Sequence, residues 1–362
     1  MLVRKQLFFQ VVLLFLLLPL TSTKTTKSKS TKKCGDLSTI SVSDECSGKW
    51  KDMKERMHPT QPTLGFAWVE YKLNNYISSK SEAQKELNEK IVPVCKGPEN
   101  DVWILDHHHV LAALDLSTYS STKITIHIVC DYSSVTNTME DFWNKMIQNE
   151  MTYLMIRQPT NNYASLPSFS LPWEKVPWII NFNATQTSFI DDPWRSLVGF
   201  SRKIESNDCI HKYCDRAFIK SCDKYNRGIP FFEFRWSYFF NDAYYQGCPS
   251  SSYKSGSGSN TGLWLNCSSY FIFKKKFELM VSKKLIPGQI NTATWKELAP
   301  LLVPLARSMK SAGNYIVPAS QGGCSGKLPG FVNSTSPIAN EDPNCELPIC
   351  SDFPPSLFLK PY

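Results

Sequence analysis

The sequence lacks the short motifs that mark several large enzyme classes. It contains no G-x-S-x-G, no G-x-x-x-x-G-K-[ST], no H-E-x-x-H and no G-x-G-x-x-G. These patterns supply an exposed nucleophilic serine, a phosphate-binding loop, a pair of zinc-binding histidines and a dinucleotide-binding turn, respectively. Serine hydrolases, Walker-type NTPases, zincins and Rossmann enzymes therefore receive no support.

Long hydrophobic runs are also scarce, and the longest is at the N-terminus. Residues 7–20 are mostly apolar, follow Arg4 and Lys5, and lead into small polar residues. The run is short for a bilayer, which needs ~20 residues, and its flanks are typical of a secretory signal peptide. We predict a signal peptide at residues 1–22, with an uncleaved anchor as the alternative. After cleavage we expect no membrane span, and a chain that is secreted or held in the lumen of the secretory pathway.

Acidic residues are absent from the first 33 positions, and this absence distorts the net charge. The whole sequence carries +8, but residues 1–33 hold seven Lys and Arg, which leaves +1 for the remainder. Residues 23–33 contain only Ser, Thr and Lys, so we expect a flexible linker there, followed by an N-terminal cysteine segment that ends at residue 57. A nucleic-acid-binding domain normally carries its basic excess on the folded part. Nucleic acid therefore stays an open alternative as a partner, without support from the charge of the body.

No cysteine precedes residue 34, yet twelve cysteines follow. In a chain that enters the secretory pathway, disulfides are the default state of such residues. Five of them fall in a cysteine-rich insertion predicted at residues 205–268, where a zinc site is the alternative. Three N-x-[ST] sequons predict glycosylation at Asn183, Asn266 and Asn333.

Blocks of apolar and polar residues predict a compact mixture of strands and helices at residues 58–135. The periodicities indicate strands at 64–69, 91–95, 102–105 and 123–130, with the middle two as a hairpin, and helices at 82–90 and 109–116. We expect residues 136–331 to be mainly helical around the insertion, and the Pro- and Cys-rich tail at 332–362 to have little regular structure. Pro300 and Pro304 are predicted to kink or split a helix that begins near Trp295.

Histidine is scarce as well, but three of the six histidines are adjacent. Asp106 precedes His107, His108 and His109 where an apolar strand gives way to residues that favour a helix. The start of a helix presents free backbone N–H groups and a positive dipole end, so this turn suits an anion such as a phosphate. One imidazole would donate or accept a proton, while Asp106 would orient a ring or cap the helix.

Adjacent side chains cannot all point the same way. In an extended turn His107 and His109 share one face and Asp106 and His108 share the other, so we expect at most two histidines to line a site. Two alternatives stay open. His107 and His109 could chelate a divalent metal together with a distant carboxylate, or the turn could simply carry surface histidines.

Several segments resemble, in the same order, the putative ParB-like nucleases of the ParB/sulfiredoxin superfamily. The matching pieces are PTQ at 59–61, GF at 65–66, VEYK at 69–72, IVPV at 91–94, GP at 97–98, ILDHHH at 104–109, DDPWRSL at 191–197, PFFEFRW at 230–236, LARS at 305–308 and LPGF at 328–331. The resemblance implies an α+β fold, in which a small mixed-sheet ParB/sulfiredoxin-like core is followed by a mainly helical part. The leader, the cysteine-rich insertion at 205–268 and the tail are departures of this chain from the family.

The resemblance also implies a role for the histidine turn. Members of the superfamily bind nucleotides or phosphates with the turn after this strand, and several place a Gly there, followed by His or Arg. This chain departs from that pattern, because His107 stands at the Gly position and no Arg follows.

Four more residues in the matching segments are candidates for ligand binding. Gln61 and Lys72 lie in the early segments, and Lys72 would either neutralise a phosphate or be a solvated surface residue. Arg195 and Arg235 carry guanidinium groups that suit phosphates. Their alternative role is an internal salt bridge, such as Arg235 with Glu233 or Asp192, that supports the helical part against the core.

The leading hypothesis is a secreted, disulfide-bonded protein that binds or hydrolyses a phosphate-bearing ligand, a nucleotide or a nucleic acid, at the turn of Asp106 to His109. Nuclease, phosphohydrolase and phosphotransferase activities stay open. No cofactor is identified, and a divalent metal remains an alternative. The second hypothesis is a non-catalytic extracellular binding module with a degenerate site.

Overall fold

In the computed structural model, the structure describes residues 32–134, 138–149, 151–157, 168–182, 188–201, 203, 232–248, 264, 267–283 and 285–308. All of them belong to one compact unit that starts at Lys32. The predicted signal peptide at 1–22 and the tail at 332–362 lie outside the described residues, as does most of the insertion at 205–268. The predicted glycosylation sites lie outside them too, at Asn183, Asn266 and Asn333.

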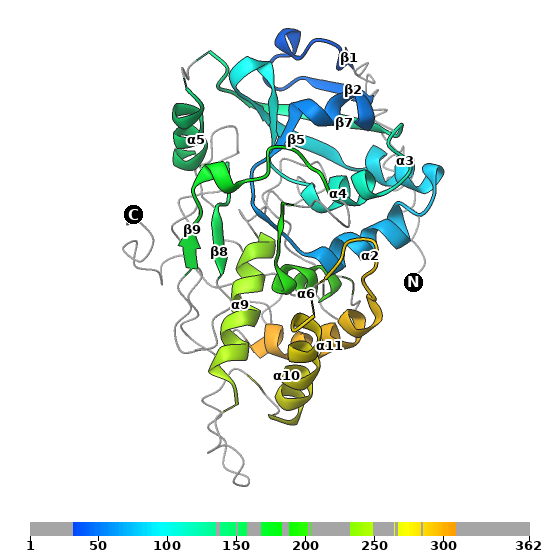
Figure 1. The fold of residues 1–362 in the computed structure, drawn as a ribbon, viewed down its shortest axis with the longest axis vertical. Coiled ribbons are helices and arrows are strands. Elements are labelled where there is room, and N and C mark those ends of the chain that lie inside the picture. The colour runs from blue at the N-terminus through cyan, green and yellow to red at the C-terminus, as the bar shows by residue number, and fades with distance from the viewer. Residues whose placement is uncertain are drawn as a thin grey trace, which may run out of the picture. The chain divides into compact units, whose positions relative to one another are not determined.

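A mixed sheet of six strands is the main sheet of this unit (Figure 1). Its strands lie in the order β1-β2-β7-β5-β6-β3. They are β1 (Lys32–Lys33), β2 (Glu45–Lys49), β3 (Met57–Pro59), β5 (Ile91–Lys96), β6 (Val102–Ile104) and β7 (Lys123–Asp131). The pairs β2–β7 and β5–β6 are antiparallel, whereas β1–β2, β3–β6 and β5–β7 are parallel. The predicted mixed-sheet core is therefore confirmed.

The predicted hairpin and the predicted strand at 123–130 are both present. A short 3-10 turn at Pro98–Asn100 joins β5 to β6. In β7 the side chains of Ile124, Ile126 and Ile128 are fully buried, while Thr125 and His127 are partly exposed. This alternation is what a period of two predicts for a strand with one face in the core.

Helices cover both faces of the sheet. They are α2 (Phe66–Tyr76), α3 (Lys80–Asn88), α4 (His108–Leu116) and α5 (Met139–Gln148). Val94 and Ile104 belong to the larger core, which also contains buried residues of α2, α3 and α4. Cys95 and Trp103 belong to a smaller core with α5. Successive residues of β5 and β6 thus contribute to the two different cores, as the pleat of a strand requires.

The strand predicted at residues 64–69 is wrong. Only β4 (Thr63–Leu64) is extended there, where it pairs with β10 (Ile190–Asp191), and α2 begins at Phe66. Phe66 and the next four residues are all buried, mainly by α4 and α6. A short run that is apolar on every side fits a buried strand and a buried helix equally well, so periodicity could not distinguish them.

Among the described residues of the predicted helical part at 136–331, four helices follow α5, and α6 lies among them. They are α6 (Pro193–Ser201), α9 (Phe232–Gln246), α10 (Cys267–Val281) and α11 (Ala293–Ser308). α6 contacts α2, α9 and α11, and so connects the helical part to the helix that follows β4 (Figure 1). Trp194 of α6 packs against Tyr244, Phe273 and Phe277, whose ring centroids lie 4.4–6.0 Å from its own.

The prolines do not split the last helix, so the split that was one of the two predicted outcomes is wrong. α11 runs from Ala293 to Ser308 through both Pro300 and Pro304. Proline removes one backbone hydrogen bond and crowds the preceding turn. Trp295, Leu298, Ala299 and Leu302 are buried, and this packing holds the helix across Pro300.

The remaining described elements are short. α1 (Trp50–Met53) follows β2, and β8 (Met155–Arg157) pairs antiparallel with β9 (Ser168–Ser170). None of the helices in the described ranges is both long enough and apolar enough to cross a membrane.

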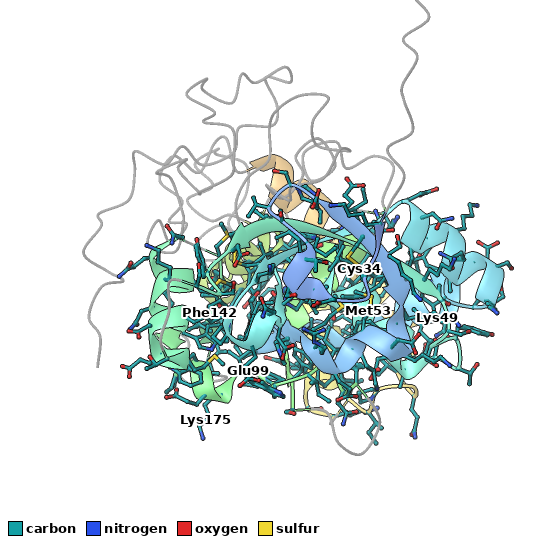
Figure 2. The ribbon with its side chains drawn as sticks, turned by 90° about the horizontal axis from the view of Figure 1, so that it is seen from above. Cys34, Lys49, Met53, Glu99, Phe142 and Lys175 are labelled. Carbon is teal, nitrogen blue, oxygen red and sulfur yellow. A yellow bond between two sulfur atoms is a disulfide. The ribbon has the colours of Figure 1, made fainter. Side chains whose placement is uncertain are left out.

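Three disulfides join cysteines of the described residues, which confirms the predicted disulfide bonding for these positions. The pairs are Cys34–Cys46, Cys95–Cys130 and Cys248–Cys267. Cys34 and Met53 lie close together in Figure 2, and both flank Gly48, where a side chain would collide with Met53. Cys95 and Cys130 are direct partners across β5 and β7.

Candidate functional site

The histidine turn connects β6 to α4, as the sequence predicted. β6 ends at Ile104 and α4 begins at His108. Between them, His107 has the left-handed backbone conformation, with φ 70° and ψ 17°. Its backbone N–H donates to Oδ1 of Asp106 at 2.5 Å. Glycine adopts this conformation without steric cost, whereas other residues do so rarely.

His108 points into the protein and binds the backbone of the loop before β4. Its Nε2 accepts a hydrogen bond from the N–H of Thr60 at 3.2 Å, and the residue is 2% exposed. The Thr60 hydroxyl in turn donates to the carbonyl of Ile104 at 2.6 Å. A ring nitrogen that accepts a hydrogen bond carries no proton, so this imidazole is neutral. Burial lowers the pKa of His108 to about 3, although the charge of Asp106 opposes the shift.

His109 supports the start of α2 in the same way. Its Nε2 accepts from the N–H of Gly65 at 3.0 Å, and its Nδ1 lies 3.8 Å from Oε2 of Glu233. Gly65 is required here because a Cβ at this position would lie 2.5 Å from the backbone nitrogen of Ser196. His109 therefore joins α4 to α2 and faces a carboxylate of α9.

Two further groups complete the start of α2. The N–H of Phe66 donates to Oδ1 of Asp191 at 2.8 Å, and the N–H of Trp68 lies 3.3 Å from the hydroxyl of Ser196. Burial raises the pKa of Asp191 to about 7, the bond from Phe66 lowers it, and the neighbouring Asp192 raises it. The first N–H groups of this helix are thus largely bound by side chains of the protein itself.

These contacts correct the expected arrangement of the turn. His107 and His109 do not share a face of an extended segment, because His107 is left-handed and the helix has already begun at His108. Two of the three imidazoles are committed to backbone N–H groups. Asp106 does not cap α4, whose N-cap is His107, and Asp106 bonds the N–H of His107 instead.

Unlike the rings of His108 and His109, the imidazole of His107 does not bind a backbone N–H group of the described residues. Its side chain is 13% exposed, Nδ1 lies 3.9 Å from Oδ2 of Asp106, and the buried Nε2 has no hydrogen-bond partner among the described residues. Burial lowers the pKa of His107, and the charges of Lys90 and Lys72 lower it further against the opposing charge of Asp106. His107 is therefore a neutral imidazole, and the charges that act on it are those of two lysines and two acids, because Glu86 raises its pKa as Asp106 does.

Lys72 lies on α2 and connects this turn electrostatically to an aromatic group. Its Nζ is 5.2 Å from the ring centroid of Trp68 and 5.4 Å from that of Tyr76. Burial lowers the pKa of Lys72 to about 8, Glu86 raises it, and Lys90 lowers it further. Lys72 is thus a half-buried cation near His107 rather than a fully solvated surface residue.

Arg195 serves as an internal bridge, the alternative considered for the two arginines. It is 3% exposed, donates from Nη1 to the carbonyl of Thr63 at 2.7 Å, and holds Nη2 3.5 Å from Oε2 of Glu233. Its guanidinium carbon lies 3.9 Å from the ring centroid of Phe234. The observed partner of Glu233 is Arg195, whereas the predicted pairing of Arg235 with Glu233 or Asp192 falls on a side chain outside the described part.

Three other residues named from the sequence are Gln61, Arg235 and Asp192. Gln61 is buried, at 6% exposure, in the loop that His108 binds. Arg235 belongs to α9, and its side chain lies outside the described part. Asp192 caps α6 by accepting from the N–H groups of Trp194 and Arg195 at 3.0 and 3.2 Å.

Sequence reasoning missed three groups that hold the region together, namely Thr60, Asp191 and Glu233. Thr60 and Asp191 lie in matching segments, but their contacts cross more than 40 residues of sequence and no local pattern reveals them. Glu233 was considered only as a partner of Arg235.

The histidines and their surroundings do not form a metal site within the described ranges. No group of three or more His, Cys, Asp or Glu side chains there could hold a metal ion. Chelation by His107 and His109 would also compete with the bond from Gly65 to His109.

Comparison with known proteins gives one family match. A family model described as a putative ParB-like nuclease matches residues 53–242, slightly more than half of the chain. Among solved structures, the crystal structure of protein Atu1540 from Agrobacterium tumefaciens is similar at 23% identity and a TM-score of 0.37, over 55% of this chain and 80% of that one. No curated protein matches the chain.

Proposed function

This chain belongs to the putative ParB-like nuclease family, and on that premise we propose that it binds a phosphate-bearing ligand, a nucleotide or nucleic acid, at the Asp106–His107 end of the turn. His107 contacts the phosphate and Lys72 neutralises its charge. His108 and His109 hold the site in shape without touching the ligand.

The unpartnered Nε2 of His107 is the observation that carries this proposal. A buried polar atom without a partner costs about 1–3 kcal/mol, and a phosphate oxygen would supply the missing acceptor. The ring is neutral because its pKa is lowered, so its one proton is available to Nε2 for donation. The charges of Lys72 and Lys90, which lower that pKa, favour an anion beside the ring and act against those of Asp106 and Glu86, which raise it.

The backbone adds a second group. His108 is the first residue of α4, and its N–H has no hydrogen-bond partner among the described residues. The positive end of the helix dipole lies at the same point. A left-handed residue directly before a helix start turns successive N–H groups toward one side, a geometry that suits anions.

The site could bind a phosphate without catalysing a reaction, so hydrolysis and binding alone are two candidate functions. Hydrolysis would use the other neutral tautomer, in which Nδ1 carries the proton and faces Asp106, so that Nε2 takes the proton of the attacking water as its oxygen bonds to phosphorus and the leaving group departs. Non-catalytic binding is the second candidate function. The observation that favours it is the commitment of two of the three histidines to backbone N–H groups.

Replacing His107 by glycine tests the proposal with little risk to the fold. Glycine suits the left-handed backbone at this position and removes only the imidazole. We expect the variant to melt within a few degrees of the parent, and to bind inorganic phosphate and the four ribonucleoside triphosphates at least about tenfold more weakly, a loss of about 1.4 kcal/mol. Isothermal titration calorimetry on the purified mature chain measures the affinities.

His127→Gln is the matched control, because His127 lies on β7 and is not one of the groups around the turn. It should bind these ligands as the parent does. Equal affinities of the parent and a folded His107→Gly variant would refute the role of His107. Failure of the parent to bind any of the five ligands would refute phosphate binding itself.

We also propose that the mature chain resides outside the cytosol. The three disulfides of the described residues support an oxidising compartment. N-terminal sequencing of the chain recovered from the medium of a secreting eukaryotic host should begin close to residue 23. Full-length chain that remains in the cytosol with reduced cysteines would contradict this assignment.

A further inference from the structure

Next to the turn, four aromatic side chains pack into one group, which we call the aromatic platform: Trp68, Tyr71, Tyr76 and Phe200. Trp68 stacks on Tyr71 with ring centroids 4.9 Å apart and planes at 6°. Phe200 of α6 meets both rings edge-on, at 5.3 and 5.2 Å. Trp68 and Phe200 are buried, whereas Tyr71 and Tyr76 are half-buried and form its accessible side.

Three lysines from separate elements converge on this platform. Lys72 of α2 and Lys203, which follows α6, hold Nζ 5.4 and 5.1 Å from the ring centroid of Tyr76. Lys296 of α11 holds Nζ 5.0 Å from the centroid of Tyr71. Because both nitrogens lie within 5.4 Å of the same ring centroid, the Lys72 and Lys203 nitrogens are less than twice that distance apart.

The three ammonium groups share a second property. Among the described residues, none of them lies within ion-pair distance of a carboxylate, although Lys32, Lys54, Lys96 and other lysines of the chain do. Each cation–π contact stabilises a lysine only weakly at an exposed site. Mutual repulsion opposes this gathering, and Lys203 contributes to the lowered pKa of Lys72. An added anion would remove that repulsion.

Lys72 makes the platform continuous with the turn. The helix that carries Lys72, α2, packs against α4, which begins directly after His107, while Lys72 shares the ring of Tyr76 with Lys203. Lysine ammonium groups are point charges on flexible stems, so they accept phosphates in many orientations where an arginine fork would select one. The arrangement suits a row of negative groups better than a single one.

We propose that Lys203 and Lys296 on the aromatic platform form a second anion subsite, and that the ligand is an extended chain of phosphates running from His107 across Tyr76 to Tyr71. This inference rests on the proposed function. A linear polyphosphate and the backbone of a single-stranded nucleic acid share this chemistry. Lys72 binds the part between the two subsites.

The dependence of affinity on ligand length tests the second subsite. The mature chain is titrated with inorganic phosphate, tripolyphosphate and a short oligothymidylate at low salt. We expect affinity to rise with the number of phosphates, and Lys203→Gln and Lys296→Gln each to weaken the longer ligands roughly fivefold while leaving inorganic phosphate unchanged. Both lysines are exposed, so both variants should keep the melting temperature of the parent.

Lys145→Gln, on the exposed side of α5, is the control and should change nothing. If only one of the two long ligands shows the effect, that ligand identifies the source of the phosphate chain. Equal binding of the long ligands by parent and variants would overturn the second subsite while leaving the first intact. Weakened binding of inorganic phosphate by His107→Gly tests the first subsite alone, so the two failures are distinguishable.

Discussion

Replacing His108 by alanine is expected to lower the free energy of unfolding by about 3 kcal/mol or more at pH 7. The variant removes a side chain that is 2% exposed and leaves the N–H of Thr60 without its acceptor. The two losses of stability add, because the one substitution creates both the cavity and the unsatisfied donor. Urea denaturation of the parent and the variant, monitored by circular dichroism, measures the difference.

The variant His108→Gln keeps a hydrogen-bond acceptor at this position but removes the titratable imidazole. Its amide oxygen can accept from Thr60 at similar length, so His108→Gln should lose much less stability at pH 7 than His108→Ala. An alanine variant that is as stable as the parent would show that His108 does not hold the loop before β4.

The pH dependence of the same pair of proteins has a definite sign. The imidazole binds a proton near pH 6.5 in the unfolded chain but only near pH 3 in the folded one. The unfolded state therefore binds more protons between these values, and the stability that His108 contributes is complete above pH 6.5 and falls on acidification. Relative to His108→Gln, the parent should lose about 1.4 kcal/mol per pH unit in this window. A constant difference from pH 7 to pH 4.5 would contradict the burial of a neutral ring.

Replacing Arg195 by methionine is the second change with a large expected effect, about 3–5 kcal/mol of lost stability. Methionine keeps the stem and its packing beside Phe234 but removes the charge that lies 3.5 Å from Glu233. Glu233 is 13% exposed at its side chain, and the carbonyl of Thr63 would lose its donor as well. Thermal unfolding of the purified variant measures the loss.

The double variant Arg195→Met with Glu233→Gln is the control for this bridge. Removing both charges should restore part of the stability, since no buried charge then lacks its partner. A single variant as stable as the parent would mean that the bridge between α6 and α9 contributes nothing. A double variant less stable by the sum of both single losses would mean that the two residues do not act together.

Local sequence patterns were sufficient for much of the sheet and for several helices. The alternation of Ile124, Ile126 and Ile128 identifies β7, and the helix-favouring residues after the histidine turn identify α4 at His108–Leu116. They failed where burial is complete on all sides, as at residues 66–69, and where tertiary packing overrides proline, as in α11. In each failure a contact with a distant element decides the outcome.

For the histidines of the turn, the sequence predicts their position but not their partners. The position of the run between a strand and a helix follows from the sequence. The commitment of His108 and His109 depends on Thr60 and Gly65, which lie 48 and 44 residues away. The resemblance predicts a glycine position at His107, and the backbone there has the left-handed conformation that glycine adopts without steric cost.

The central claim is that His107 meets the ligand while His108 is a fixed structural acceptor. Long-range proton–nitrogen spectra of the imidazole nitrogens test it directly, recorded on the mature protein between pH 5 and pH 8 with and without tripolyphosphate. The account predicts that His108 keeps one neutral tautomer, protonated at Nδ1, throughout this range, and that the ligand shifts the nitrogens of His107 but not those of His108. Titration of His108 near pH 6.5, or a ligand shift at His108 with none at His107, would contradict it.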